Sequence, residues 1–282
     1  RKDTYEIKRP VFLQGNLTIE AGTNLKFSKN AYLIVKGNIN IKGLKDQPVI
    51  MTSADENQTW KGIYVYNDEV SKKGKSYIKN LKISNMTELD DGILNLTGGI
   101  NFYNLDLIIS NLKITNSKAE DSLNIIKSFV EIKDLYIKDT KSDAFDCDFC
   151  EGSISNFSLN KIGGDGLDLS GSSIIASISN AHNVKDKVVS VGERSTINLD
   201  IKKVSKSYVA VAVKDASNAN IIMEDINTVG PKVMSYIKKP FYLGETNVKI
   251  KYNNSGQILN LNNNFLASNE TNMFVNNKKI KT

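Results

Sequence analysis

Apolar and polar residues alternate along most of the chain in short runs, and this pattern predicts β-strands. Apolar residues recur at every second position in the pairs Leu17/Ile19, Leu25/Phe27, Leu33/Val35, Ile39/Ile41 and Val49/Met51. The runs are broken by glycines at Gly15, Gly22, Gly37 and Gly43. Because a period of two is typical of a strand and the helical period of 3.6 is absent, the chain is predicted to be all-β.

Residues 118–195 repeat this pattern at a fixed interval. Four similar stretches follow one another: SKAEDSLNIIKS, TKSDAFDCDFCEGS, GGDGLDLSGSS and VKDKVVSVGERS. Each has an aspartate in the same place, at Asp121, Asp143, Asp165 and Asp186, with steps of 22, 22 and 21 residues. A second strand is predicted to begin after each stretch, at Asp134, Asn156, Asn180 and Asp200. A fixed period of this length indicates a solenoid, and short strands within each period indicate a parallel β-helix.

We expect one solenoid domain of about ten coils over the 282 residues. Residues 1–60 would form the N-terminal coils and a cap, and residues 61–230 the central coils. Residues 231–282 would contain a loop insertion and a C-terminal capping segment. The insertion is expected at 231–247, where two prolines and a pair of lysines break the period. A cap is expected because the open end of a solenoid exposes an unpaired strand edge.

Composition excludes some classes of function. The net charge is +6 and the pI is near 9.0, which favours acidic partners without naming one. Basic residues are not interleaved with aromatic residues as in a nucleic-acid groove, so no nucleic-acid partner is expected. The only histidine is His182, which argues against His-based triads and metal sites. The opening RKDTYEIKRP has no apolar run, so neither a signal peptide nor a membrane span is expected there.

The two cysteines, Cys147 and Cys150, lie three residues apart. Two thiols with no histidine nearby fall short of the four ligands of a structural zinc site. Three residues of extended strand span roughly 10 Å, which is too far for a disulfide. We therefore expect one buried thiol and one thiol at a turn, with a redox pair as the alternative.

Two parts of the sequence resemble known β-helix proteins. GNLTIEAGTNL at 15–25 and WKGI at 60–63 resemble the opening of bacterial right-handed β-helix proteins of the pectate-lyase-like superfamily. The four repeated stretches are similar to an uncharacterised bacterial group of β-helix repeat proteins. The resemblance extends over nearly the whole chain, and it implies a right-handed helix and polysaccharide substrates. The NTD, GHG and RIK motifs usual in that superfamily are absent, so polygalacturonase or pectate-lyase activity is not implied.

Strand alternation places a row of polar side chains on the outside of successive coils. Residues predicted to point inward are Leu123, Ile125, Phe145, Cys147, Phe149, Leu167 and Leu169. The outward row is predicted to contain Tyr103, Asn124, Asp146 and Asp168, with coils about 4.8 Å apart. Two carboxylates about 5 Å apart repel each other by roughly 3 kcal/mol at an effective dielectric constant near 20, or about two pKa units. Such repulsion favours a functional site.

An enzyme is the first of three readings of this row. Asp146 and Asp168 would be catalytic, one as general acid and the other as base or nucleophile, at a spacing close to that of retaining glycosidases. A lyase or epimerase would instead use Lys187 as the base, with Ca²⁺ on Asp146, Asp148 and Asp168 neutralising a uronate. The residues expected to bind substrate are Tyr103, Asn124, Asp148, Ser170 and Glu193.

The other two readings are a binding or surface-display module and a purely structural ladder. A site would require the row to lie between walls, formed by loops at 66–76 and 231–247, whereas a scaffold would leave it flat. The aspartates that mark the repeat are expected to be structural, because an aspartate before a strand commonly accepts backbone N–H groups. We expect a secreted or cell-surface protein whose partner is a polysaccharide.

Overall fold

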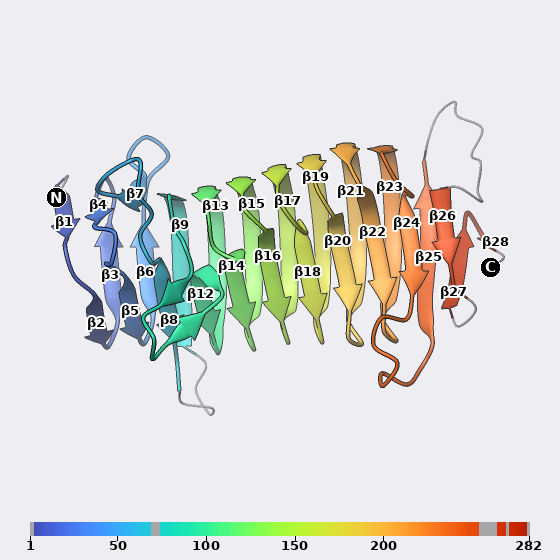
Figure 1. Cartoon of the computed structure of the whole chain (residues 1–282), viewed down its shortest axis with the longest axis horizontal. Coiled ribbons are helices and arrows are strands. Elements are labelled where there is room, and N and C mark those ends of the chain that lie inside the picture. The colour runs from blue at the N-terminus through green and yellow to red at the C-terminus, as the bar shows by residue number, and fades with distance from the viewer. Residues whose placement is uncertain (1–2, 69–73, 254–263, 269–270, 281–282) are drawn as a thin grey trace.

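The computed structural model describes residues 3–68, 74–253, 264–268 and 271–280, which wind into a right-handed parallel β-helix (Figure 1). One sheet, here called sheet B, contributes one strand to each of eleven coils, close to the predicted ten. Its strands are β2 (Val11–Gln14), β5 (Leu33–Lys36), β8 (Ile63–Tyr66), β12 (Gly98–Tyr103), β14 (Asp121–Ile126), β16 (Asp143–Asp148), β18 (Leu167–Ser170), β20 (Lys187–Gly192), β22 (Val209–Lys214), β24 (Val233–Tyr236) and β26 (Phe265–Ala267).

A fifteen-stranded sheet, here called sheet A, forms the rest of each coil. Its strands are β1 (Thr4–Ile7), β3 (Leu17–Glu20), β4 (Asn24–Phe27), β6 (Ile39–Lys42), β7 (Val49–Ser53), β9 (Gly74–Ser84), β13 (Leu105–Ser117), β15 (Phe129–Thr140), β17 (Glu151–Ile162), β19 (Ser173–Val184), β21 (Thr196–Ser207), β23 (Asn218–Thr228), β25 (Thr246–Tyr252), β27 (Thr271–Val275) and β28 (Lys278–Lys279). A short antiparallel hairpin, β10 (Leu89–Asp90) with β11 (Asn95–Leu96), projects from the stack.

Asparagine and aspartate side chains mark the bends inside the long strands of sheet A. Asn80, Asn111, Asp134 and Asn156 all have positive φ, between 49° and 58°, which these two residue types tolerate better than most. Their side chains form a ladder: Asn111 Nδ2 donates to Asn80 Oδ1 at 2.6 Å, and Asn156 Nδ2 donates to Asp134 Oδ1 at 2.5 Å. Asp134 and Asn156 therefore lie at bends within β15 and β17, and not at the start of separate strands.

Inward side chains stack into one continuous apolar core along the solenoid. Phe27 and Trp60 stack with ring centroids 3.9 Å apart, and Phe145 meets Phe157 edge to face at 6.4 Å. Each such buried side chain contributes about 1.5–3 kcal/mol to folding. All but one of the predicted inward residues of the repeat are fully buried: Leu123, Ile125, Phe145, Cys147, Leu167 and Leu169.

The prediction for Phe149 and for the cysteines was wrong, for one shared reason. Phe149 has φ of 55° and is 58% exposed, because the chain turns there at the end of β16. This turn brings the Cα atoms of Cys147 and Cys150 to 5.9 Å, and the two residues form a buried disulfide. The prediction assumes that the three-residue spacing is extended strand, whereas the left-handed conformation at Phe149 shortens it.

Two predicted segments lie partly or wholly outside the described residues. These are the loop expected at 66–76, of which 69–73 are not described, and the C-terminal capping segment expected within 231–282, of which 254–263, 269–270 and 281–282 are not described. Within the ranges that are described, no helix has the length and apolar character needed to cross a lipid bilayer.

Candidate functional site

The predicted row of polar side chains is present on sheet B. Parallel pairing places Asn124 opposite Asp146 and Asp146 opposite Asp168, on three consecutive coils. The row continues to Asn101 on one side and to Ser190 on the other. Asn124 is expected in solvent, yet it is only 6% exposed, and Ser190 at the end of the row is fully buried.

Tyr103 does not belong to this row, contrary to the prediction. Asn101 pairs with Asn124, so Tyr103 pairs with Ile126, two residues further along the strand. That coil has no aspartate at the repeat position, and the sequence therefore offered nothing to set its phase. Tyr103 lies in the next outward row, where Lys127 Nζ contacts its hydroxyl at 3.3 Å.

A second outward row brings further predicted residues beside the first. Asp148 pairs with Ser170, one coil apart. Burial, with smaller contributions from Glu193 and Asp168, raises the pKa of Asp148, while a hydrogen bond with Ser170 opposes that rise.

The aspartates that mark the repeat lie beside the same site. Asp143 Oδ1 accepts the backbone N–H of Asp165 at 2.7 Å, and Asp165 Oδ1 accepts that of Lys187 at 2.9 Å. The expected structural role is confirmed for Asp143 and Asp165, with the difference that each carboxylate accepts a backbone N–H of the next coil. Sequence reasoning missed that they also approach the predicted row. We call Asp121, Asp143, Asp146, Asp148, Asp165 and Asp168 the acidic cluster.

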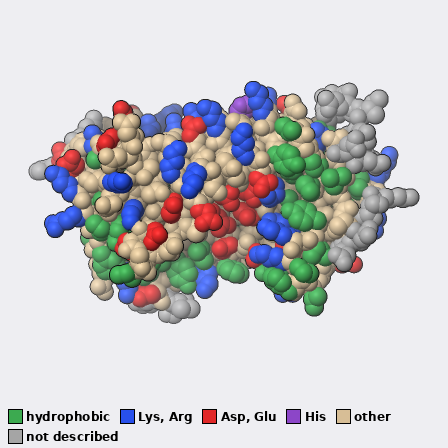
Figure 2. All heavy atoms as spheres, in the orientation of Figure 1, with side chains coloured by type: hydrophobic (Ala, Val, Ile, Leu, Met, Phe, Trp, Pro, Cys, Tyr) green, Lys and Arg blue, Asp and Glu red, His purple; other side chains and the backbone are tan. Residues whose placement is uncertain are grey.

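Figure 2 shows acidic side chains gathered in the middle of one face of the solenoid. Burial, followed by the charges of Asp148, Asp121 and Asp168, raises the pKa of Asp146 to about 9. At neutral pH Asp146 therefore keeps its proton. Burial is also the main cause that raises the pKa of the three repeat aspartates to about 6, namely Asp121, Asp143 and Asp165.

Lys187 is the cation that offsets part of this negative charge. Its Nζ lies 3.1 Å from Asp165 Oδ1 and is also ion-paired with Asp186. Burial lowers the pKa of Lys187, but contacts with Asp186 and Asp165 outweigh burial and the net shift is upward. Lys187 is therefore held as a charged ammonium at neutral pH.

Three carboxylates of the cluster converge closely enough to share a cation. Asp143, Asp165 and Asp168 each offer an oxygen, and these oxygens lie within 4.8 Å of one another. The predicted metal ligands were Asp146, Asp148 and Asp168. Of these three, only Asp168 belongs to the converging set found among the described residues, where its partners are Asp143, at the start of β16, and Asp165, just before β18.

Two segments flank the acidic cluster along the solenoid axis. On the N-terminal side, Thr97 Oγ1 accepts a hydrogen bond from Asn124 Nδ2 at 2.9 Å. The corresponding wall was predicted at 66–76, whereas the contact found comes from the end of the β10–β11 hairpin region.

On the C-terminal side, Asp215 Oδ1 accepts the backbone N–H groups of Lys238 and Lys239 at 2.6 and 2.7 Å. Glu193 accepts hydrogen bonds from Lys239 Nζ and from the Tyr242 hydroxyl. Burial raises the pKa of Glu193, but these two contacts outweigh burial and the net shift is downward. The predicted wall at 231–247 is thus fastened to the coils at Asp215 and Glu193, and Glu193 is engaged within the protein.

Comparisons with known proteins concern the fold. Residues 1–87 match a family model described as a pectate-lyase-like beta helix domain. This match covers the first coils and does not reach the acidic cluster. No curated protein matches the chain.

Several solved structures resemble the chain distantly. One is the catalytic domain of a GH87 α-1,3-glucanase in complex with nigerose, with 11% identity, a TM-score of 0.46, and coverage of 90% of this chain and 63% of that chain. Another is an alginate lyase from Paenibacillus sp. str. FPU-7, with 10% identity, a TM-score of 0.38, and coverage of 91% and 99%. A third is the A-module of the mannuronan C-5 epimerase AlgE4 from Azotobacter vinelandii, with 10% identity, a TM-score of 0.30, and coverage of 97% and 91%.

The chain spans less than two thirds of the glucanase domain, and TM-scores below 0.5 assign no activity to it. The match over residues 1–87, together with eleven stacked coils, confirms the resemblance to pectate-lyase-like parallel β-helix proteins.

Proposed function

We propose that the chain is an enzyme that acts on a polysaccharide, with the acidic cluster as its acid–base machinery. The observation that carries this proposal is the convergence of six aspartates from three consecutive coils on one face. Among the described residues, Lys187 is the only cation ion-paired with any of them. Repulsion between these carboxyls lowers the stability of the fold, and clusters of like charge that do so are found mainly at functional sites.

The cluster offers a proton donor next to a second carboxyl. Asp146 is protonated at neutral pH because its pKa is raised to about 9, and Asp168 lies on the adjacent strand. In the proposed reaction Asp146 protonates the glycosidic oxygen as the bond breaks, while Asp168 attacks the anomeric carbon. Neighbouring strands lie about 4.8 Å apart, near the spacing of about 5–5.5 Å typical of retaining glycosidases. Water would then release the sugar from Asp168.

A hydrolase is favoured over the lyase and epimerase alternatives by the state of Lys187. Those reactions need a base that is free to remove a proton from carbon. Two carboxylates hold Lys187 in its charged form, since contacts with Asp186 and Asp165 raise its pKa. In this proposal Lys187 stabilises the arrangement of the carboxylates and does not take a proton.

We also propose that the cluster binds Ca²⁺ through Asp143, Asp165 and Asp168, because Ca²⁺ is bound by several oxygen ligands, among them Asp carboxylates. The Ser190 hydroxyl supports this assignment. Ser190 pairs with Asp168 in the outward row, is fully buried, and has no hydrogen-bond partner among the described residues. A bound cation would lower the pKa of nearby carboxyls and bring Asp146 closer to the range suited to a general acid.

The second candidate function is a non-catalytic surface or glycan-binding module, in which the cluster is structural. The observation in its favour is that Asp143 and Asp165 hold the backbone of the next coil. Either function suits a secreted or cell-surface protein, and the disulfide suits an oxidising compartment.

Replacing Asp146 or Asp168 with Asn is expected to lower polysaccharide turnover by about 10²–10⁴-fold, the usual contribution of a positioned acid or base. Turnover would be measured as release of reducing ends from α-1,3-glucan, alginate and polygalacturonate. Asp46→Asn, at an exposed position in an early coil, is the matched control and should behave as the parent. Full turnover by both site variants, or none by the parent on a broad panel of bacterial polysaccharides, would contradict the enzymatic assignment.

The stability of Asp146→Asn separates the functional from the structural reading. The ordinary pKa of Asp is about 3.9, and the folded state raises that of Asp146 to about 9. Between these values the folded state binds more protons than the unfolded state, so its contribution to stability falls as pH rises, by up to about 1.4 kcal/mol per unit. Asp146→Asn should therefore raise the free energy of unfolding at pH 8 by a few kcal/mol and change it little at pH 4, as measured by urea denaturation. A structural ladder predicts lower stability of the variant at both pH values.

Millimolar Ca²⁺ is expected to raise the melting temperature of the parent, because a ligand that binds only the folded state stabilises it. Asp168→Asn should remove most of this shift, and Asp46→Asn should retain it. Differential scanning calorimetry with and without Ca²⁺ measures the effect. An equal shift in the parent and in Asp168→Asn, or no shift in either, would refute the cation site.

A further inference from the structure

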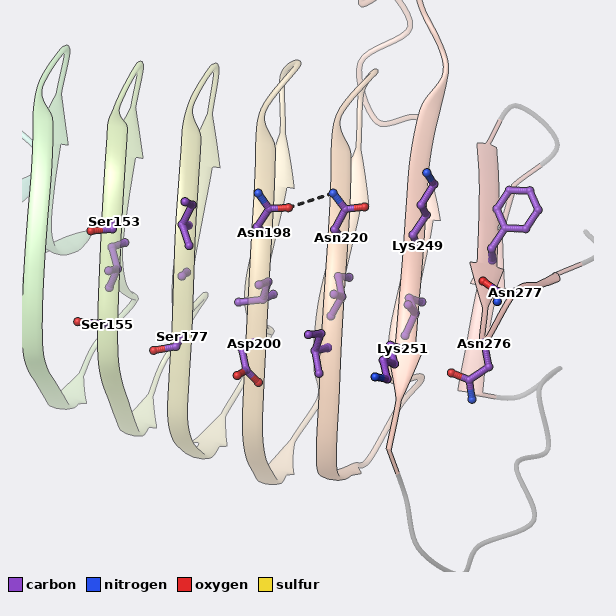
Figure 3. Close-up of a pocket in the computed structure, with 18 residues that line it drawn as sticks. Ser153, Ser155, Ser177, Asn198, Asp200, Asn220, Lys249, Lys251, Asn276 and Asn277 are labelled. Atoms are coloured by element: carbon purple, nitrogen blue, oxygen red, sulfur yellow. Dashed lines mark hydrogen bonds between the residues drawn. The ribbon is translucent and has the colours of Figure 1, made fainter.

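Sheet A carries a second surface site, on strands other than those that hold the acidic cluster. A groove of about 890 Å³ crosses β17, β19, β21, β23, β25 and the end of β27 (Figure 3). Six neighbouring strands at about 4.8 Å spacing give the groove a length of roughly 24 Å along the solenoid axis. A groove of this shape suits an extended, linear ligand.

Strand register arranges hydroxyl and amide side chains along this groove in lines. Ser153, Ile175, Asn198, Asn220 and Lys249 follow one another on adjacent strands. Asn220 Nδ2 donates to Asn198 Oδ1 at 3.0 Å, as Figure 3 shows. This bond orients both amides and leaves Asn198 Nδ2 and Asn220 Oδ1 available to a ligand.

Apolar side chains lie between these polar groups. Ile175 and Ile222 point outward from the solenoid, and they are 61% and 42% exposed. Alternating hydroxyl, amide and aliphatic groups match the surface of a sugar, which presents hydroxyls around its ring and C–H groups on its faces. The lining therefore favours a carbohydrate.

An extended peptide is a poorer occupant. Strands β19, β21, β23 and β25 are each paired on both sides, so their backbone N–H and C=O groups are already hydrogen-bonded. Strand addition, the usual way in which a sheet binds a peptide, requires a free edge. A ligand in this groove would therefore be bound by side chains and not by the backbone.

The charges of the groove favour an acidic chain. Lys249 and Lys251 are exposed at its C-terminal end, and no ion pair engages either within the described part of the protein. Asp200, the acidic residue of the groove, is ion-paired with Lys202 at 2.9 Å, and Lys202 is also paired with Glu224 at 2.7 Å. The groove thus presents uncompensated positive charge beside its neutral hydrogen-bonding rows.

We propose that this groove is a second binding site, which holds a linear acidic polysaccharide along the solenoid axis. No bond is made or broken there. The proposal goes beyond the chemistry of the acidic cluster and does not depend on it, since binding in the groove needs none of the six aspartates.

Affinity electrophoresis in gels containing alginate tests the proposal, with hydroxyethylcellulose as the neutral polymer. The Asp146→Asn variant serves as the background, so that turnover does not consume the probe. Lys249→Ala/Lys251→Ala and Asn198→Ala/Asn220→Ala should each weaken alginate binding about tenfold, a change of about 1.4 kcal/mol. Lys79→Ala/Lys133→Ala, on earlier strands of the same sheet and exposed in the same way, should bind as the background does.

Retardation by hydroxyethylcellulose should be weaker than by alginate. The proposal is overturned if alginate does not retard the protein, if both polymers retard it equally, or if both groove variants bind as the background does. Loss of binding in Asp168→Asn with retention in the groove variants would place alginate at the acidic cluster, and would also overturn it. Melting temperatures of all variants would establish that these exposed substitutions leave the fold intact.

Discussion

Parallel pairing of consecutive coils at a nearly constant repeat is the constraint on which the rest of this structure depends. A repeat of 22 residues returns the chain to the same place on the neighbouring coil, so equivalent positions stack directly. For apolar residues the stacking produces one continuous core. For aspartates it produces a line of like charges, because Asp146 and Asp168 must lie side by side whenever Phe145 and Leu167 share the core.

The fold tolerates this line of charge in three ways. Asp143 and Asp165 accept backbone N–H groups of the next coil, Lys187 neutralises Asp165, and Asp146 keeps its proton since burial and its neighbours raise its pKa to about 9. Each device lowers the electrostatic cost without removing it. Asp146 is then a protonated carboxyl beside three carboxyls whose pKa values are raised to about 6, namely Asp121, Asp143 and Asp165. General acid–base chemistry requires such a combination.

Much of this arrangement was predictable from sequence, because periodicity reports register directly. The period of 22 residues predicted the solenoid, the inward residues and the adjacency of Asn124, Asp146 and Asp168. The errors came from positions where the chain leaves the strand geometry. A positive φ at Phe149 turned that side chain outward and closed the disulfide between Cys147 and Cys150.

The remaining errors concern side chains at the starts of strands and coils that lack the marker aspartate. Asp143 and Asp165 were expected to accept backbone N–H groups alone, and the period does not show that their carboxylates also converge with that of Asp168. Asn101, and not Tyr103, lies in the row beside Asn124. The prediction was wrong there because the coil before the repeat has no aspartate that marks its register. The groove on sheet A was not predicted at all, since its lining alternates between polar and aliphatic residues as any exposed strand does.

The central claim is that register and burial together hold Asp146 protonated within a cluster of carboxylates. Carbon-13 NMR of the aspartate carboxyl groups, followed over a pH titration, measures this most directly. The account predicts one carboxyl signal that titrates far above the ordinary range for aspartate and that is absent from Asp146→Asn. If every aspartate of the parent titrates near pH 4, the cluster is not buried as described, and the proposed chemistry has no proton donor.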